Sequence, residues 1–189
     1  MFYQIVRAGR EEIGLVWNYG GKKPQIEYIY LPDSKVKLKE RIVKDYPEIN
    51  KIPNKIPGGI DDLIAKLYLG KKENIDLSLL NLFKLTDFSA KVLKQACKIP
   101  RGKVGTYSGL AAKVGCPGAA RAVGTALANN PFPIIIPCHR VIRSDGSLGG
   151  FGGGIRMKRE LLSKEGVTLN SQGRVSATER EQTVAAGNS

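Results

Sequence analysis

The chain has 189 residues, of which 42% are hydrophobic, and 30 Lys and Arg outnumber 17 Asp and Glu to give a net charge of +13. This length suits one domain or two small ones, which fold without disulfide staples. Three cysteines are too few for a disulfide scaffold. The chain has neither a signal-peptide start nor the ~20 apolar residues of a membrane span. We therefore expect a soluble, cytoplasmic protein with no membrane partner.

The basic excess is larger after residue 75 than before it. A basic region of this kind favours a polyanionic partner such as nucleic acid. A basic surface that serves solubility alone is the alternative, so the charge by itself leaves the partner open.

Residues 1–75 are predicted to form a small α/β domain. Short β-rich runs indicate strands at residues 2–6, 13–17 and 26–30, with a turn at Gly20-Gly21. Asp33-Ser34 predicts the cap of a Lys-rich helix that ends near Tyr46. After breaks at Pro53 and Pro57, a second helix is expected over residues 61–69. This part contains neither Cys nor His, so it offers no ligands for a zinc site.

Residues 76–169 are predicted to form a second domain that is mainly helical. Thr86 is a suitable N-cap for a helix whose apolar face includes Val92 and Leu93. Two further helices are expected over residues 109–114, starting at Ser108, and 119–128, separated by a Gly-Cys-Pro-Gly turn. This layout is typical of a helix-turn-helix, although many helical pairs bind nothing.

The helix over residues 119–128 is built from small side chains with one long cation, Arg121. Small side chains allow close approach to another surface. That surface is either the core of the domain or DNA, and minor-groove proteins insert arginines in this way.

The sequence around Cys138 indicates a reactive centre. Residues 134–136 predict a buried strand that ends at Pro137, so Cys138 follows a strand and precedes the single histidine, His139. If His139 and Arg140 approach the thiol, they lower its pKa. Cys97 and Cys116 are expected to be unreactive packing and turn residues. One His and scattered Cys lack the spacing of a metal site, so no metal is expected.

A glycine-rich segment over residues 146–154 follows the cysteine. It lacks the Gly-Lys-Ser/Thr and dinucleotide patterns, which argues against a nucleotide cofactor. It indicates either a flexible connection or a loop whose backbone lies close to a flat substrate. A last helix is predicted over residues 156–163. Glu165, just beyond it, is either a solvated terminal residue or a carboxylate that orients His139.

The motif Ile-Pro-Cys-His-Arg-Val at residues 136–141, preceded by Arg-Ala-Val-Gly and Asn-Pro, resembles the O6-alkylguanine-DNA alkyltransferases, or methylated-DNA–protein-cysteine methyltransferases. The resemblance runs from about Thr86 to Val167. It implies an α/β N-terminal domain with a ribonuclease-H-like sheet and a mainly helical C-terminal domain with a helix-turn-helix. It also implies direct-reversal DNA repair by a monomer without cofactor or metal.

The implied reaction is irreversible, single-turnover transfer of the alkyl group from O6-alkylguanine, and less firmly from O4-alkylthymine, in double-stranded DNA after base flipping. By resemblance, Cys138 is the alkyl acceptor, His139 a water-mediated base, and Glu165 the group that orients it. Asn130 pins the turn before the active-site segment. Tyr107 lies beside the flipped guanine and donates a proton toward N3.

The resemblance also assigns residues to the DNA and to the pocket. Arg121 fills the gap left by the flipped base, and the neighbouring contacts to DNA come from Thr106, Ala122 and Ala126. The pocket is lined by Val141, Phe151 and Gly152. Many family members carry a serine where this chain has Gly152, which leaves only the backbone donor at that position.

Two alternatives stay open. One is a protein of the same architecture that binds alkylated DNA without repairing it, but such relatives replace the acceptor cysteine, typically with tryptophan. The other is a helix-turn-helix regulator, which leaves the Pro-Cys-His-Arg motif unexplained. Residues 170–189 are polar and are predicted to be a disordered tail.

Overall fold

The computed structural model describes residues 1–20, 23–51, 56 and 58–179, and the chain divides into two compact units. The first unit comprises Met1–Lys84 and Pro131–Ile135, and the second comprises Leu85–Asn130 and Ile136–Ser189. The division falls later than the predicted residue 75, because the segment before Lys84 continues the first sheet: Leu80 pairs with Ile26, and Asn81 N donates to Ile26 O at 3.0 Å.

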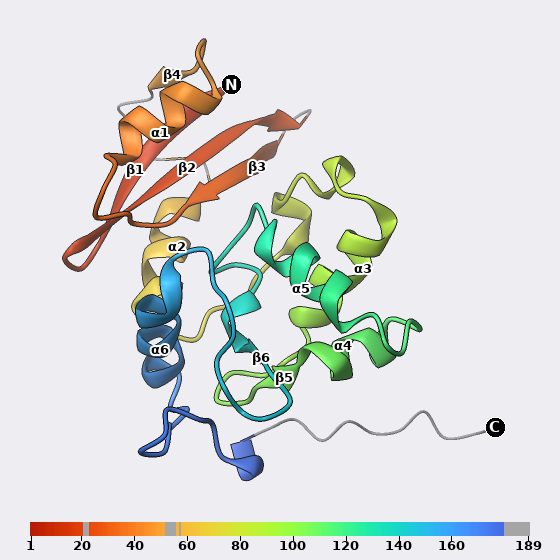
Figure 1. The fold of residues 1–189 in the computed structure, drawn as a ribbon. Coiled ribbons are helices and arrows are strands. Elements are labelled where there is room, and N and C mark those ends of the chain that lie inside the picture. The colour runs from red at the N-terminus through yellow and green to blue at the C-terminus, as the bar shows by residue number, and fades with distance from the viewer. Residues whose placement is uncertain (21–22, 52–55, 57, 180–189) are drawn as a thin grey trace. The chain divides into compact units, whose positions relative to one another are not determined.

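The first unit is a four-stranded sheet with helices packed against it (Figure 1). Its strand order is β3-β2-β1-β4. The strands are β1 (Phe2–Ala8), β2 (Glu11–Gly20), β3 (Lys23–Tyr30) and β4 (Asn50–Lys51), and the helices are α1 (Leu38–Asp45) and α2 (Ile60–Tyr68). Strands β1 to β3 are antiparallel, whereas β4 runs parallel to β1. The predicted α/β character of this part is thus confirmed.

The start of α1 differs from the prediction. Helix α1 starts at Leu38 and has no side-chain cap, so the predicted cap at Asp33-Ser34 is wrong. The Asp33 carboxylate instead accepts from Lys35 N at 2.8 Å in a turn ahead of the helix. The predicted breaks at Pro53 and Pro57, and half of the predicted turn at Gly20-Gly21, lie outside the described residues.

The second unit is mainly helical, with α3, α4 and α5 packed side by side (Figure 1). Its elements are α3 (Asp87–Ala96), β5 (Gly105–Thr106), α4 (Tyr107–Lys113), α5 (Ala120–Ala128), a 3-10 turn (Cys138–Arg140), β6 (Val141–Ile142), α6 (Gly154–Lys164) and a 3-10 turn (Ala177–Glu179). The predicted cap of α3 is confirmed, since Thr86 Oγ1 accepts from Ser89 N at 3.2 Å. Helix α4 begins before the predicted Ser108, because Thr106 Oγ1 caps it by accepting from Gly109 N at 2.9 Å.

The predicted strand over residues 134–136 is wrong, although its burial is right. Ile134 and Ile135 form a turn, and Ile134 has a φ of 76°. The flanking Pro131, Pro133 and Pro137 lack the N–H groups that a paired strand requires. The segment is therefore buried as an irregular connection, with Pro131 O accepting from Ile29 N at 2.8 Å.

The prediction of a disordered tail is wrong for residues 170–179. Val175 is only 1% exposed and packs in a core cluster with Ile142, Leu148 and Leu162. Its N–H donates to Gly146 O at 3.0 Å, and the Glu179 carboxylate accepts from Thr168 N at 2.9 Å. One apolar side chain and a set of backbone hydrogen bonds thus order this polar segment. Residues 180–189 lie outside the described part.

Among the described residues, no helix combines the length and the apolar character needed to cross a membrane.

The C-terminal segment is expected to contribute to stability through Val175. Val175→Ala removes two buried methyl groups and should lower the free energy of unfolding by about 2 kcal/mol. Urea unfolding of the variant and wild type measures the difference. Ser171→Ala, in the exposed turn of the same segment, is the matched control and should have almost no effect. Equal unfolding free energies for Val175→Ala and wild type would contradict the packing role.

Candidate active site

A cavity of about 550 Å³ lies within the second unit. Its walls come from α4, α5, the turn at Cys138–Arg140 and the glycine-rich loop that precedes α6. Tyr107, Arg121, Cys138, Arg143 and Phe151 are among the residues that line it. The cavity therefore brings together residues from four separate segments of the sequence, including five of the predicted site residues: Tyr107, Arg121, Cys138, Phe151 and Gly152.

Cys138 is 7% exposed, and its thiol is held by Asn130. Asn130 Nδ2 lies 3.2 Å from both Cys138 Sγ and Ile136 O, to which it donates. Burial raises the pKa of Cys138, while the Asn130 hydrogen bond and the positive charge of Lys158 oppose this shift. The thiol is thus neutral at rest. The backbone of His139 lowers the pKa of Cys138, as the sequence predicted for this neighbour, but burial outweighs that contribution.

Glu165 joins His139 and Arg140 in one buried network. His139 Nε2 lies 3.0 Å from Glu165 Oε1, and the Arg140 guanidinium donates to both carboxylate oxygens at 2.8 Å. Arg140 Nη1 also donates to Ile99 O at 2.8 Å. Burial raises the pKa of Glu165, but hydrogen bonds from His139 and Arg140 outweigh it and lower the pKa to about 2. The carboxylate is consequently ionised and fixed in orientation.

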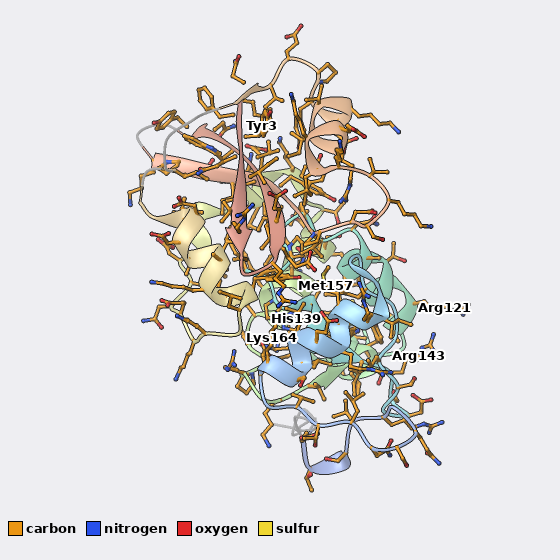
Figure 2. All side chains as sticks on the ribbon, turned by 90° about the vertical axis from the view of Figure 1, so that its left-hand side faces the viewer. Tyr3, Arg121, His139, Arg143, Met157 and Lys164 are labelled. Carbon is orange, nitrogen blue, oxygen red and sulfur yellow. The ribbon has the colours of Figure 1, made fainter. Side chains whose placement is uncertain are left out.

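The tautomer of His139 follows from this network. An ionised carboxylate only accepts, so His139 Nε2 carries the hydrogen that it donates to Glu165. Burial lowers the pKa of His139, which keeps the imidazole neutral and leaves Nδ1 with a lone pair. Among the described residues, the buried Nδ1 has no hydrogen-bond partner. The ring is therefore prepared to take up a proton at Nδ1. Figure 2 shows His139 beside α6, the helix that carries Met157 and Lys164 and against which this turn packs.

Lys158 is a site residue that sequence reasoning missed. Its side chain is fully buried, and Nζ donates to Val141 O at 2.6 Å and to Gly150 O at 3.2 Å. Nζ also lies 5.9 Å from the centre of the Tyr107 ring. Burial lowers the pKa of Lys158 to about 8, an effect that the negative charge of a Cys138 thiolate opposes. The lysine links β6 to the glycine loop and stabilises negative charge on the cysteine.

A signal for Lys158 existed in the sequence. Lys158, Leu161 and Leu162 have the spacing of one helical face, and both leucines are buried. A lysine on an apolar helical face is an informative exception, because buried lysines need polar partners.

Tyr107 meets the glycine loop at close range. Burial raises the pKa of Tyr107, helped by the charge of Cys138 and opposed by that of Arg143, so its phenol stays protonated. A Cβ on Gly149 would lie only 2.8 Å from Tyr107 Oη, and Gly149 has a φ of 69°. Both observations require glycine at this position. The backbone of the loop thus lies against the Tyr107 ring, and its predicted approach to a flat substrate stays a prediction.

The remaining predicted residues differ in position. Arg121 and Ala122 are exposed on α5, and Thr106 is half-buried with its hydroxyl capping α4. Ala126 is 6% exposed and belongs to the core, so its predicted contact with DNA is wrong. Helix α5 turns its small residues toward both the core and the surface, and Ala126 is on the core side.

Of the three predicted pocket residues, two line the cavity. They are Phe151 and Gly152, whereas Val141 is buried and takes part through its carbonyl, which accepts from Lys158. No atom lies within 4 Å of a Cβ built on Gly152. The glycine at this position is therefore not imposed by crowding, and a serine would fit.

The arrangement supports a specific kind of chemistry. The neutral thiol of Cys138 lines the cavity, and the neutral imidazole of the next residue, His139, is hydrogen-bonded to an ionised carboxylate. These are the groups from which proteins build an activated nucleophile. Within the described ranges, no group of three or more His, Cys, Asp or Glu could hold a metal ion. The site is thus of the class in which a cysteine thiol is paired with a histidine and a carboxylate.

Comparison with known proteins identifies the family. Residues 87–167 match the family described as 6-O-methylguanine DNA methyltransferase, DNA binding domain. The methylated-DNA–protein-cysteine methyltransferase of Methanothermobacter thermautotrophicus is 39% identical over 162 residues, which cover 85% of this chain and 83% of that protein. The protein of the same name from Mycobacterium tuberculosis is 44% identical over 113 residues, covering 60% of this chain and 67% of that protein.

Solved structures agree with this result. The Mycobacterium tuberculosis OGT in complex with DNA superposes with a TM-score of 0.70 at 32% identity, covering 87% of this chain and 92% of that one. The O6-methylguanine-DNA methyltransferase of Pyrococcus kodakaraensis gives a TM-score of 0.64 at 28% identity, covering 88% and 99%. The chain belongs to the methylated-DNA–protein-cysteine methyltransferase family.

The network around Glu165 predicts a specific acid dependence of stability. Its folded-state pKa of about 2 lies below the ordinary 4.5, so its stabilising contribution is complete above about pH 4.5 and is lost as the pH falls toward 2. Glu165→Gln should lower the free energy of unfolding by about 3 kcal/mol at neutral pH, because it leaves Arg140 buried without its charge partner. The difference from wild type should shrink between pH 4.5 and 2.

Urea unfolding at pH 7, 4 and 3 measures this dependence. Glu160→Gln is the matched control, since Glu160 lies on the same helix and forms only an exposed pair with Arg156 at 3.8 Å. A deficit for Glu165→Gln that stays constant with pH would show that its ionisation is not coupled to folding.

Proposed function

We propose that this protein repairs DNA by direct reversal, transferring the alkyl group from O6-alkylguanine in double-stranded DNA to its own Cys138. The observation that carries the proposal is that the Cys138 thiol lines a cavity and is followed directly by His139, whose ring is hydrogen-bonded to Glu165. Family membership supports the same reaction. O4-alkylthymine is a second, weaker substrate in this proposal.

The proposed reaction starts with removal of the thiol proton. His139 Nδ1 accepts the proton from Cys138 through a water molecule, and Glu165 stabilises the resulting imidazolium. Asn130 and Lys158 stabilise the thiolate by a hydrogen bond and by charge. The low-dielectric surroundings make this stabilisation larger than it would be in water.

The thiolate then attacks the alkyl carbon. The Sγ–C bond forms as the C–O6 bond breaks, and the electron pair of the broken bond passes to the guanine. The guanine takes up one proton, which balances the proton lost by the thiol, and the protonated phenol of Tyr107 assists by donating toward N3. The product is a thioether with no simple reversal, so each molecule reacts once. No cofactor or metal takes part in these steps.

DNA binding is proposed to use α4 and α5 as a helix-turn-helix in the minor groove. A base within a duplex is out of reach of Cys138, so it is flipped at a cost of a few kcal/mol. Arg121, exposed on α5 and lining the cavity, occupies the gap, and Ala122 and Thr106 contact the backbone. We also propose that the protein acts as a monomer and that the sheet of its first unit is ribonuclease-H-like. Three free cysteines are consistent with a cytoplasmic location.

The proposed transfer is expected to methylate one residue, Cys138. Incubation with duplex DNA that contains O6-methylguanine should add one methyl group to the protein, and peptide mass spectrometry should place it on Cys138. Repair should be stoichiometric with protein. Cys138→Ser should bind the same duplex but gain no mass, and Cys116, exposed on the surface, is the internal control for unspecific alkylation. Tight lesion binding by wild type without a mass change would favour the alternative, a lesion-binding protein.

Arg121 is expected to act on the duplex rather than on the chemistry. Arg121→Ala should slow repair of duplex O6-methylguanine at least about tenfold more than it slows the reaction with free O6-benzylguanine, because the free base needs no extrusion. Rates of methyl and benzyl transfer to Cys138 measure the ratio. Equal losses on both substrates would contradict the role in base flipping.

A further inference from the structure

The rim of the cavity holds two arginines whose side chains are uncommitted. Arg121 and Arg143 are exposed, line the cavity, and form no side-chain hydrogen bond or ion pair with any other described residue. Figure 2 shows the two side chains on the same side of the second unit. By contrast, Arg140 and Arg174 of this unit pair with carboxylates. The proposed base flipping accounts for Arg121 and leaves Arg143 without a role.

Arg143 stands on a turn that is held firmly. Its N–H donates to Ser147 O at 2.9 Å, and its carbonyl accepts from Gly146 N at 3.0 Å. Asp145 closes the turn by accepting from Ser147 N at 2.9 Å. Val175 of the C-terminal segment donates to Gly146 O from the other side. The backbone that carries the guanidinium is thus fixed, which lowers the entropy lost when a ligand binds.

Hydroxyl groups surround the same place. Ser144, the next residue, has its Oγ 2.9 Å from Ser108 Oγ, and Ser108 Oγ lies 3.2 Å from Thr106 Oγ1. All three hydroxyls belong to residues that are exposed or half-buried. A guanidinium beside exposed hydroxyls is the donor set that proteins use for phosphate oxygens of DNA.

The place of Arg143 in the cavity wall indicates which DNA phosphate would lie near it. A base that enters the cavity to meet Cys138 leaves its sugar and phosphates at the mouth, where Arg143 lies. Arg143 lines the same cavity as Tyr107, and its positive charge lowers the pKa of that phenol against the effect of burial.

We propose that Arg143, with the hydroxyls of Ser144 and Ser108, binds a DNA phosphate next to the extruded nucleotide and so holds the lesion in the cavity. The proposal rests on the proposed function, since it assumes that a nucleotide enters this cavity. Arg143 and Arg121 then have separable tasks. Arg121 replaces the base in the duplex, whereas Arg143 holds the strand that carries the lesion.

Three substrates separate the two tasks. Single-stranded DNA needs no extrusion but still has the phosphate, and free O6-benzylguanine has neither. Arg143→Ala should slow alkyl transfer from both duplex and single-stranded O6-methylguanine about tenfold relative to free O6-benzylguanine, as expected for loss of one charged hydrogen bond. Arg121→Ala should have its large effect on the duplex alone. Arg159→Ala is the matched control, because Arg159 is equally exposed and uncommitted among the described residues but lines a different cavity.

The phosphate itself is tested by removing its charge. Oligonucleotides with one neutral methylphosphonate at each position around the lesion should include one position at which wild type and Arg143→Ala react equally fast. The log–log salt slope of duplex binding should also be smaller by about 0.9 in the variant. Behaviour of Arg143→Ala like Arg159→Ala, an equal loss with free O6-benzylguanine, or a defect that persists with every methylphosphonate would each overturn the proposal.

Failure of the proposed function gives a different result. In that case wild type gains no alkyl group on Cys138 from any substrate. The Arg143 contact is then still measurable as affinity, with Cys138→Ser protein and its Cys138→Ser, Arg143→Ala counterpart binding duplex that contains O6-methylguanine. A tenfold weaker affinity of the second protein supports the contact, and equal affinities refute it.

Discussion

The buried ion pair between Arg140 and Glu165 is the interaction on which the site depends. The guanidinium meets both carboxylate oxygens and also holds Ile99 O, so the carboxylate is fixed in place and in charge. That fixed charge decides the tautomer of His139, and the tautomer decides that Nδ1 is the basic nitrogen. Without Arg140, only the hydrogen bond and charge of His139 would oppose the effect of burial, which raises the pKa of Glu165.

Burial raises the pKa of the Cys138 thiol, and neighbouring groups oppose this rise. A buried thiol is protected from unspecific reaction, but burial also raises its pKa and suppresses the nucleophilic thiolate. Burial likewise raises the pKa of Cys97, to about 11, although the charge of Arg140 opposes the shift. Cys138 differs because Asn130 donates to its sulfur and because Lys158 supplies a nearby positive charge. These two groups lower the pKa of Cys138 against the effect of burial, and in the proposed reaction His139 takes up the thiol proton.

The sequence predicted most of what is encoded within contiguous motifs. Cys138, His139 and Glu165 were identified from residue type and order, and the structure brings His139 and Glu165 together at 3.0 Å. The effect of burial on the thiol pKa was missed, because neighbours in sequence do not reveal desolvation. Lys158 was missed because its partners are backbone carbonyls, which any sequence supplies. The sequence signal for a buried Lys158 was its place on the same helical face as Leu161 and Leu162.

The errors in secondary structure have the same origin. Residues 134–136 are as apolar as a buried strand. The prolines on both sides lack the N–H groups that hydrogen bonds between paired strands require. The tertiary arrangement decides that the segment forms a turn. The segment over residues 170–179 has too little apolar surface to predict order, but Val175 fills one place in an existing core. The local sequence determines the secondary-structure propensity of a segment. Whether the segment is ordered, and in which conformation, depends on the part of the protein against which it packs.

The short parallel pair β5–β6 explains why these separate residues converge. Gly105 pairs with Val141 and Thr106 with Ile142, so the strand ends bring Tyr107 beside the segment that contains Cys138 and Arg143. Val141 then accepts from Lys158 through its carbonyl, which connects the pair to the glycine loop. Two residues per strand are enough to bring these side chains together, because Thr106 is followed directly by Tyr107 and Ile142 by Arg143. Tyr107, Cys138 and Arg143 therefore all lie within three residues of this pair, and a shift of the pair would disturb all three together.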